Sequence, residues 1–513
     1  MKAPRGQIGV FLALSSVLIF ALICTCLEGA RAACTDYLTR LAAESSLQSV
    51  FAAYQGEVRR EYGLLLCRGR TAWWNCWKDE AQRYAEKYLA PGVGRSESGS
   101  DRVRAMSVNA EEVESVYITE GQGRIFADEV TDYMKSADLS ILLKEVLERL
   151  GLYSEEDGFA FLNSLRDMLS DQDSSPEGIL DNYRDLKEQA AKLQELAAGE
   201  EGSGGSGSPA PSGETPAAAS GDVKADLLEQ IQAIRENGLI AVITGSETLS
   251  AFSWEDDSLA SRLPQSEKNR NSGYPSSSVS LLQHFLMGEF LLSRMGNYTD
   301  KRADGAQYEI EYVLSGKNSD KAAFETVVGE ILLIRMGFNL VYLIGDAEKQ
   351  LQAETLAAAI LSVLALPQLT VVLKWLLLAA WALAESIVDV KVLLKGRKLP
   401  LFKTAASWQL NALSLDLSAG NGTASGLTYE DYLRLLFYLG NAEEQSYRMM
   451  DVMEKRIRLK VPAFQMREYM VYAAVSVTVT TAYLYIQAPA LRLTETGKGR
   501  RYVRQASRSY GRR

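Results

Sequence analysis

The first strong feature of the hydrophobic pattern is an uncharged, apolar run near the N-terminus. No charged residue occurs between Ile8 and Leu27, whereas Lys2 and Arg5 come before the run and Glu28 follows it. Twenty helical residues span about 30 Å, the thickness of the hydrocarbon core of a bilayer. The sequence therefore predicts a membrane-spanning helix. The side chains expected to face lipid are Ile8, Val10, Phe11, Leu12, Leu14, Val17, Leu18, Ile19, Phe20, Leu22, Ile23 and Leu27.

The charges around this run predict its orientation. Because positive residues beside a span favour the cytoplasmic side, Lys2 and Arg5 place the N-terminus in the cytoplasm and the bulk of the chain outside it. The expected location is the cell membrane, with a single pass. Two processed forms stay open: a secretory signal cut after Ala32, and a pilin-type leader cut near Gly6. The run exceeds the roughly 7–15 apolar residues usual in a signal peptide, which favours a permanent anchor.

The segment after the run is amphipathic. Apolar residues recur at helical steps from Tyr37 to Tyr62, and no proline interrupts residues 5–62. We therefore expect one continuous helix, apolar all round in its first half and on one face in its second half. This arrangement resembles that of a type IV pilin or pseudopilin, in which lipid holds the first half and a globular head packs on the second.

Three later segments have the pattern of β-strands. Residues 307–314 alternate apolar and polar positions and end at Gly316, which is typical of a half-buried strand. Residues 470–486 are rich in β-branched side chains, and 114–119 form a shorter candidate. We expect these segments to join one small antiparallel sheet.

Helical patterns cover most of the remaining chain. The predicted helices lie at about 123–150, 156–199, 280–296, 320–343 and 428–460. Residues 356–384 form a second long apolar segment, which by length could be another span. Pro367 and Lys374 lie in its middle, and both are costly inside a membrane helix. Two buried helices joined near Pro367 are the favoured interpretation, with membrane contact as the alternative.

The predicted fold class is α+β and mainly helical, with a long helix that runs from the membrane into a globular region containing the small sheet. Residues 201–221 are rich in Gly, Ser, Pro and Ala and indicate a linker. The expected regions are 1–33 (cytoplasmic N-terminus and span), 34–200 (membrane-proximal, helical with one strand), 201–221 (linker), 222–490 (globular) and 491–513 (basic tail).

Charge and composition exclude some partners. The net charge of −10 argues against nucleic acid, whose phosphates require clustered Lys and Arg. The exception is the basic tail, 491–513, which contains no acid after Glu495 and could contact anionic lipid or a cell-wall polymer. The aromatic residues within 71–90 are a second candidate binding element, although we favour a core position for them.

The sequence offers little catalytic chemistry. Its one histidine, His284, lies in an apolar helical stretch and is typical of a packed histidine rather than a ligand. No phosphate-binding loop or nucleophile-elbow motif occurs. Cys67 and Cys76 could form one bridge, but a single pair is no disulfide framework. We expect no catalytic residue, no cofactor and no metal.

Glu385 and Asp389 are the best carboxylate pair in the chain. At positions i and i+4 they share one face of an apolar helix. Such a pair could hold a cation or perform acid–base chemistry. The favoured interpretation is structural: buried carboxylates that accept backbone N–H groups or pair with nearby cations. Those cations would be Lys391, Lys395 or Arg397.

A family resemblance covers most of the chain outside the linker and the tail. The segments that carry it are Gly6–Leu12, Leu27–Arg31, Ser49–Tyr54, Glu61–Leu64, Tyr308–Leu314 with Gly316, Trp381–Ser386 with Asp389, then Leu394, Gly396, Lys398, Trp408, Tyr429, Asp431–Leu433 and Arg448–Asp451. They resemble a bacterial membrane-anchored family of unknown function that is associated with tight-adherence (Tad, Flp-type) pilus loci.

The resemblance implies an accessory or pseudopilin-like envelope protein, with other pilus or secretion components as partners, and it implies no catalytic residues. Pilins carry a Glu five residues after the leader cut, whereas Phe11 holds that place here. This departure favours an anchor over a fibre-forming subunit. The function we expect is therefore non-enzymatic. The alternatives are an extracytoplasmic binding module for cell-wall polymer or a surface ligand, and an enzyme that uses Glu385 and Asp389.

Overall fold

The computed structural model describes residues 5–69, 106–134, 243–244, 248–271, 280–363, 367–410, 420, 422–423, 426–481 and 500–509. The chain divides into two compact units. Unit 1 comprises 1–129, 263–277 and 460–513, and unit 2 comprises 130–262 and 278–459. The predicted linker, the aromatic residues at 71–90, Cys76 and the predicted helix at 156–199 lie outside the described residues.

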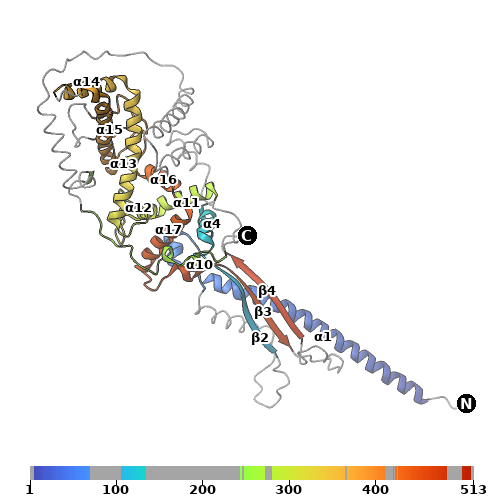
Figure 1. The fold of residues 1–513 in the computed structure, drawn as a ribbon. Coiled ribbons are helices and arrows are strands. Elements are labelled where there is room, and N and C mark those ends of the chain that lie inside the picture. The colour runs from blue at the N-terminus through green and yellow to red at the C-terminus, as the bar shows by residue number, and fades with distance from the viewer. Residues whose placement is uncertain are drawn as a thin grey trace. The chain divides into compact units, whose positions relative to one another are not determined.

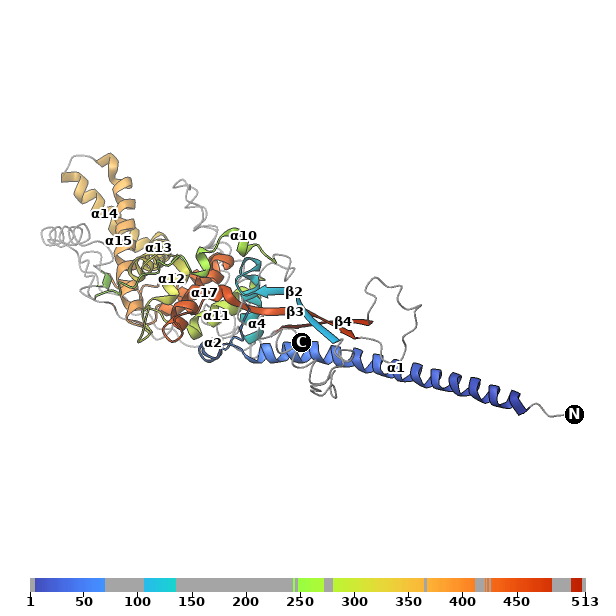
Figure 2. The same cartoon turned by 90° about the horizontal axis from the view of Figure 1, so that it is seen from below.

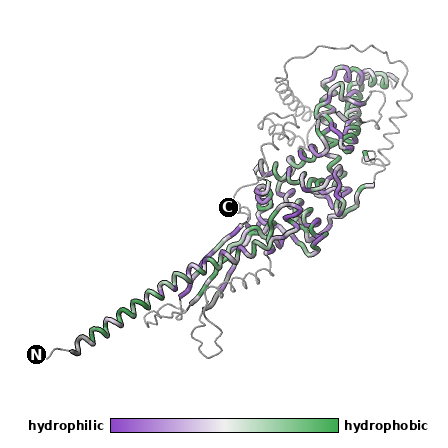
Figure 3. The backbone as a smooth tube through the Cα atoms, turned by 180° about the vertical axis from the view of Figure 1, so that it is seen from behind, coloured by the Kyte–Doolittle hydropathy of each residue, from purple (hydrophilic) through white to green (hydrophobic). Residues whose placement is uncertain are grey.

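Unit 1 begins with a long helix, α1 (Arg5–Ala52), of 48 residues. Its first half exposes large apolar side chains: Phe11 is 70% exposed and Leu18 72%. Figure 3 shows this half as a nearly continuous hydrophobic tube. The part of the helix from Gly9 to Ala52 is long and apolar enough to cross a membrane. The predicted span-length helix is therefore present.

The helix does not run unbroken to Tyr62, as the sequence pattern predicted. It ends at Ala52, and a second helix, α2 (Gly56–Tyr62), begins after a short extended segment. In that segment the N–H of Gln55 donates to the carbonyl of Leu66, 2.9 Å away, and the backbone of Tyr54 forms an isolated antiparallel β-bridge with Cys67. The backbone of residues 53–55 thus bonds to a neighbouring segment rather than to the helix.

The sheet of unit 1 is built around β3 (Tyr469–Thr481). Within the described residues the sheet has four strands, and each of the other three pairs antiparallel with β3. The other three are β1 (Cys67–Arg68), β2 (Met106–Tyr117) and β4 (Arg500–Ser509). Val477 faces Ala110 of β2 in the register on one side and Arg504 of β4 on the other. The predicted strands at 114–119 and 470–486 are confirmed as parts of β2 and β3.

One face of this sheet covers the second half of α1, as Figures 1 and 2 both show. The alternation of β3 explains it, because every second residue points to the same face. The shared core consists of Ala32, Ala43, Leu47, Val50 and Phe51 from α1 with Met470, Ala473, Val475, Val477 and Val479 from β3 and Tyr502 from β4. The second half of α1 is thus part of a folded head.

The basic C-terminal residues are not simply a solvated tail. Residues 500–509 form the edge strand β4, which pairs with β3. In this strand Tyr502 contributes to the core, while Arg500, Arg501 and Arg508 stay exposed. Strands β2 and β3 come from regions that the sequence analysis placed in separate domains. The two compact units therefore do not follow the predicted boundaries.

Three short helices complete the described part of unit 1, and one helix continues into unit 2. They are η1 (Gly121–Gly123), α10 (Gln265–Lys268) and η4 (Met466–Glu468), with α4 (Arg124–Met134) crossing from one unit to the other.

Unit 2 is helical in its described residues. Its elements are η2 (Ala260–Arg262), α11 (Leu281–Arg294), α12 (Glu309–Ser315), α13 (Asp320–Gly345), α14 (Ala347–Val363), η3 (Pro367–Leu369), α15 (Thr370–Leu394), α16 (Tyr429–Leu439) and α17 (Ala442–Arg458). The helices predicted at 280–296, 320–343 and 428–460 are confirmed as α11, α13 and the pair α16–α17.

Capping residues explain where several of these helices begin. Ser280 and Thr428 each form a capping box, in which the hydroxyl accepts the N–H of the third helical residue and that residue's side chain accepts the N–H of the cap. Ser319 and Asn441 accept one N–H each at the starts of α13 and α17.

The predicted strand at 307–314 is wrong, because residues 309–315 form the helix α12. The alternation was misleading because a half-buried strand would turn Glu309 and Glu311 to solvent, whereas both side chains are buried. Their carboxylates accept the backbone N–H groups of Gly296 and Tyr298, at 2.7 and 2.9 Å. Gly316 then ends the helix in a left-handed conformation, with φ of 66°.

The apolar segment 356–384 forms two helices joined near Pro367, as predicted. Burial is incomplete, however: α14 and α15 pack on each other, yet Val371 and Leu376 are 66% and 61% exposed. By length and composition, α13 and α15 could also cross a membrane. Both contain charged residues in their interior, which is costly in a bilayer.

Candidate functional site

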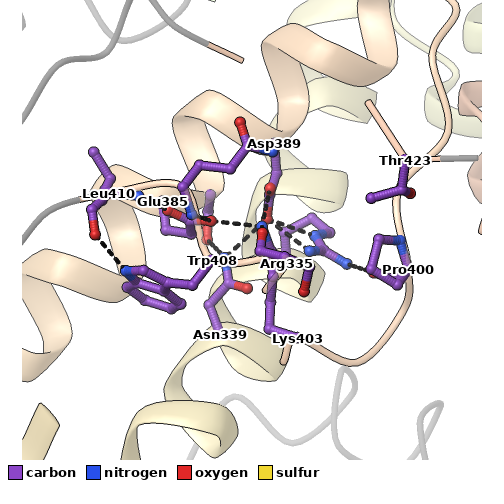
Figure 4. A network of polar contacts seen from close by, with 12 residues as sticks. Arg335, Asn339, Glu385, Asp389, Pro400, Lys403, Trp408, Leu410 and Thr423 are labelled. Carbon is purple, nitrogen blue, oxygen red and sulfur yellow. Dashed lines mark hydrogen bonds and ion pairs between the residues drawn. The ribbon is translucent and has the colours of Figure 1, made fainter. Parts of the chain in front are cut away.

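Four fully buried charges lie where α13 faces α15 in unit 2 (Figure 4). Arg335 comes from α13, and Glu385 and Asp389 come from α15. Lys403 comes from the irregular segment that follows α15. The i, i+4 spacing of Glu385 and Asp389 places both carboxylates on the face of α15 that meets α13. Two cations and two anions therefore share a site without access to water.

Arg335 connects Asp389 to the chain beyond α15. Its Nε and Nη2 atoms donate to Oδ2 of Asp389 at 3.0 and 2.7 Å. Its Nη1 donates to the carbonyls of Pro400 and Leu401, at 2.9 and 3.1 Å, and to the hydroxyl of Tyr432 on α16. One planar guanidinium thus links three elements, which suits the fixed fork of an arginine.

Lys403 joins the two carboxylates from the other side. Its ammonium donates to Oε1 of Glu385 at 2.5 Å, to Oδ1 of Asp389 at 2.7 Å and to the carbonyl of Ser407 at 3.0 Å. An ammonium has three donors, and here each has a partner. The segment reaches this position because the chain turns after α15 at Gly396, whose φ is 72°.

Glu385 also holds the backbone of the segment after Lys403. Its two oxygens accept the N–H groups of Gln409 and Leu410, each at 2.9 Å. Trp408 immediately precedes them in sequence and donates its indole N–H to the carbonyl of Leu410 at 2.7 Å. Its ring stacks on Tyr342 of α13, with 5.2 Å between centroids. A stretch without regular secondary structure is fixed in this way by helix side chains.

The electrostatics of the cluster favour the ionised form of Asp389. Burial alone would raise the pKa of Asp389, but the adjacent Arg335 and Lys403 hold that pKa below its usual range. Asn339, one turn after Arg335, adds a hydrogen bond to Asp389 at 3.0 Å. Neither carboxylate is open to a substrate in this geometry. The site can hold helices and a loop together, which fits the structural interpretation of the pair.

The sequence analysis found the carboxylates but not their partners. Lys391, Lys395 and Arg397 were the expected cations because they are close in sequence, whereas Arg335 and Lys403 hold those places. The Glu385 and Asp389 side chains point into the helix interface, whereas Lys395 and Arg397 are exposed. Arg335 and Asn339 lie four residues apart on α13, and this spacing was the signal that could have identified the face of α13 that packs on Glu385 and Asp389.

A second polar cluster, which sequence reasoning missed, surrounds α12. Glu311 is fully buried and accepts the hydroxyl of Tyr429 at 2.8 Å; burial raises its pKa to about 7. Asp451 on α17 accepts the hydroxyl of Tyr312 at 2.8 Å, and burial raises the pKa of Asp451 to about 6. Trp254 stacks on the Tyr312 ring, with 3.8 Å between centroids. Burial shifts both carboxyl groups toward the neutral form, relative to a carboxyl group in water.

The remaining predicted residues lie as follows. His284 is buried on α11, where its Nε2 hydrogen-bonds Oε1 of Gln445 at 2.8 Å, as expected of a packed histidine. Gly6 lies in the first turn of α1, and Ala32 is buried in its middle. Cys67 is buried, and its thiol donates to the carbonyl of Val50. In the described part of the chain, no group of three or more His, Cys, Asp or Glu could hold a metal ion.

These features define a class: an α+β protein with an exposed, span-length N-terminal helix, a sheet packed on that helix, and a helical unit that contains a buried charge cluster. Residues 218–481, a little more than half of the chain, match the model of a family of unknown function, DUF5702. The chain belongs to this family. No curated protein and no solved structure matches the chain.

Proposed function

We propose that this protein is a non-enzymatic, membrane-anchored component of the bacterial cell envelope that helps to assemble or tether a tight-adherence pilus or its secretion apparatus. The observation that carries the proposal is the division of α1 into two halves. The first half exposes apolar side chains on all sides, and the second half packs under an antiparallel sheet. A bilayer is the natural environment for the first half, with the N-terminus in the cytoplasm and the head outside.

The energetics of α1 support an anchor. Burying one large apolar side chain contributes about 1.5–3 kcal/mol, and many such side chains are exposed between Val10 and Leu27. Phe11 at the place of the pilin Glu favours a permanent anchor over a subunit that polymerises. The buried charge cluster in unit 2 supports a non-enzymatic role, because each of its charges is matched by a partner.

The basic strand β4 supports contact with lipid head groups. Arg504 pairs with Asp36 of α1 at 2.5 Å, and β4 runs beside α1 in the same direction (Figures 1 and 2). Since strands rise about 3.3 Å per residue and helices 1.5 Å, four residues along β4 correspond to about nine along α1. Arg500 therefore lies near the level of Leu27, where the apolar run ends. Its guanidinium could reach lipid phosphates there.

The decisive experiment on assembly is genetic. Deletion of the gene is expected to abolish or reduce pilus assembly and secretion, and the wild-type chain should restore both. Leu18→Arg with Leu22→Arg should fail to restore them and should leave the pelleted membranes, because charges at a bilayer centre are costly. Gln48→Arg with Ser49→Arg, at exposed positions of the second half, is the matched control. Unchanged pili in the deletion strain would refute the proposal.

N-terminal sequencing of the protein from membranes separates the processed forms. A start at Met1 corresponds to an intact anchor, a start at Gln7 to a pilin-type product, and a start at Ala33 to a released protein. The first outcome is expected. A start at Ala33 would contradict anchoring by α1.

The alternative function, an extracytoplasmic binding module, is favoured by β4 in particular, since Arg500, Arg501 and Arg508 are exposed. In vesicles, Arg500→Gln with Arg501→Gln should reduce the preference of the protein for phosphatidylglycerol over phosphatidylcholine, measured with spin-labelled lipids. Arg508→Gln, on the same strand but farther from the apolar run, should not. Equal effects of the two changes would place the lipid contact elsewhere. Retained binding to cell-wall polymer in the Arg500→Gln, Arg501→Gln variant would count against β4 as the binding element.

A further inference from the structure

The end of the α14–α15 hairpin in unit 2 is apolar and exposed. Figures 1 and 2 show the two helices side by side; they pack on each other, and Ala353 and Ala357 of α14 are buried. On the outside, Val371 is 66% exposed, Val372 57% and Leu369 44%. No charged residue occurs between Glu354 and Lys374. We call the described residues between these two charges, 355–363 and 367–373, the apolar tip.

We propose that the apolar tip inserts into one leaflet of a lipid bilayer. The proposal goes beyond anchoring by α1 and rests on it only because α1 supplies the bilayer. A large apolar patch on a protein surface marks a contact with protein, ligand or membrane. The distribution of charge, the dimensions of the tip and its hydrogen bonds each favour lipid.

The residues that bound the tip are those found at membrane interfaces. Lys374 pairs with Glu354 across the two helices at 2.9 Å, so both charges lie at one level. Trp375 follows Lys374 and is 41% exposed. Tryptophan and lysine are enriched where a membrane protein crosses the head-group region. Beyond this level the exposed surface contains no charge that could select a protein partner.

The depth of the tip fits one leaflet. On α14, nine residues separate Glu354 from Val363, which corresponds to about 14 Å of helix. On α15, four residues separate Thr370 from Lys374, and η3 adds a further turn, which together give about 12 Å. Half of the hydrocarbon core is about 15 Å thick. The tip can therefore enter one leaflet without crossing the bilayer.

The hydroxyl groups of the tip are satisfied within the helix. Thr355 donates to the carbonyl of Leu351, and Ser362 donates to that of Ala359, both at 2.8 Å. Such internal bonds remove the cost of taking a hydroxyl out of water. Gln368 at the turn is a polar residue whose side chain is exposed, and its amide disfavours insertion, in contrast to the apolar residues around it.

The test uses the full chain in phosphatidylglycerol–phosphatidylcholine vesicles, with the five native cysteines replaced and one nitroxide label per sample. Labels at Leu369→Cys and Val372→Cys probe the tip, and Leu18→Cys probes α1. Lys321→Cys, whose side chain is 62% exposed at the start of α13, is the aqueous control. The readout is collision of each label with oxygen, which concentrates in lipid, and with a nickel complex, which stays in water.

The labels at Leu369 and Val372 are expected to collide with oxygen in preference to nickel, with Leu369 deeper by about 5 Å because it lies three residues nearer the turn. Preferential nickel contact at Val372 would overturn the inference. Protection from both reagents there would mean that protein covers the tip, and it would overturn the inference equally. A label at Leu18 that collides with nickel would instead refute anchoring by α1, whatever the result at Val372. The two proposals therefore fail by different signals.

Discussion

Glu311 on α12 couples the stability of unit 2 to pH, and replacing it with glutamine isolates that coupling. The carboxyl has no exposed surface, and burial raises its pKa to about 7 from an ordinary value of 4.5. Its Oε1 accepts the N–H of Tyr298 and the hydroxyl of Tyr429. The amide oxygen of glutamine can accept both bonds, so Glu311→Gln keeps the shape and removes the titration.

The sign and size of the effect follow from the two pKa values. Because the folded-state pKa of Glu311 is the higher one, its favourable contribution is fully present below about pH 4.5 and is lost as the pH rises through about 7. One pKa unit corresponds to about 1.4 kcal/mol, so the loss amounts to about 3 kcal/mol for a fully buried group. The free energy of unfolding of Glu311→Gln relative to wild type should therefore rise by about 3 kcal/mol between pH 4 and pH 8.

The assay is urea denaturation of the full chain in detergent micelles, followed by tryptophan fluorescence at a series of pH values. Comparing the variant with wild type at each pH cancels the titration of all other groups. Glu325→Gln on α13, at a carboxylate whose side chain is 38% exposed, is the matched control for the substitution itself. A difference between Glu311→Gln and wild type that stays constant from pH 4 to pH 8 would refute the reasoning.

The buried charge cluster and the end of α12 give further predictions. Lys403→Met should lower the free energy of unfolding by about 3–5 kcal/mol, because it leaves two buried carboxylates with one cation. Adding Glu385→Gln should recover part of that loss. Equal stability of the single and the double variant would contradict this explanation. Lys321→Met, at a lysine whose side chain is 62% exposed at the start of α13, is its control in the same denaturation assay. Gly316→Ala should lower the melting temperature, since the left-handed backbone at Gly316 disfavours a side chain and a Cβ there would lie 2.6 Å from the guanidinium of Arg448. An unchanged melting temperature would show that Arg448 moves without cost.

The sequence pattern predicted elements whose environment is uniform along their length. The first half of α1 exposes apolar side chains on all sides, so hydropathy was sufficient to predict it. Strand β3 buries one face along its whole length, so alternation was sufficient to predict it. The pattern failed at α12, where Glu309 and Glu311 bind the buried backbone N–H groups of Gly296 and Tyr298. A carboxylate that serves a buried N–H looks the same in sequence as one that faces water.

The candidate site shows the same limit. The spacing of Glu385 and Asp389 indicated a shared and buried face, which the structure has. Their cations come from α13 and from the segment after α15, and no local rule identifies them, because charge compensation is decided by how helices pack. Similarly, the exposed end of the α14–α15 hairpin could not be told from a buried one by composition alone.

The sheet that covers α1 has a consequence for how the protein is made. Asp36 and Arg504 are separated by 468 residues in the chain, and the ribosome adds about 5–20 residues per second. The apolar face of α1 that includes Ala43, Leu47 and Phe51 must wait about 20–90 s for β3 and β4. During that interval the nascent chain exposes an apolar surface to which other chains can bind. The delay makes the nascent chain a substrate for a holding chaperone, and it makes prematurely terminated chains substrates for proteolysis.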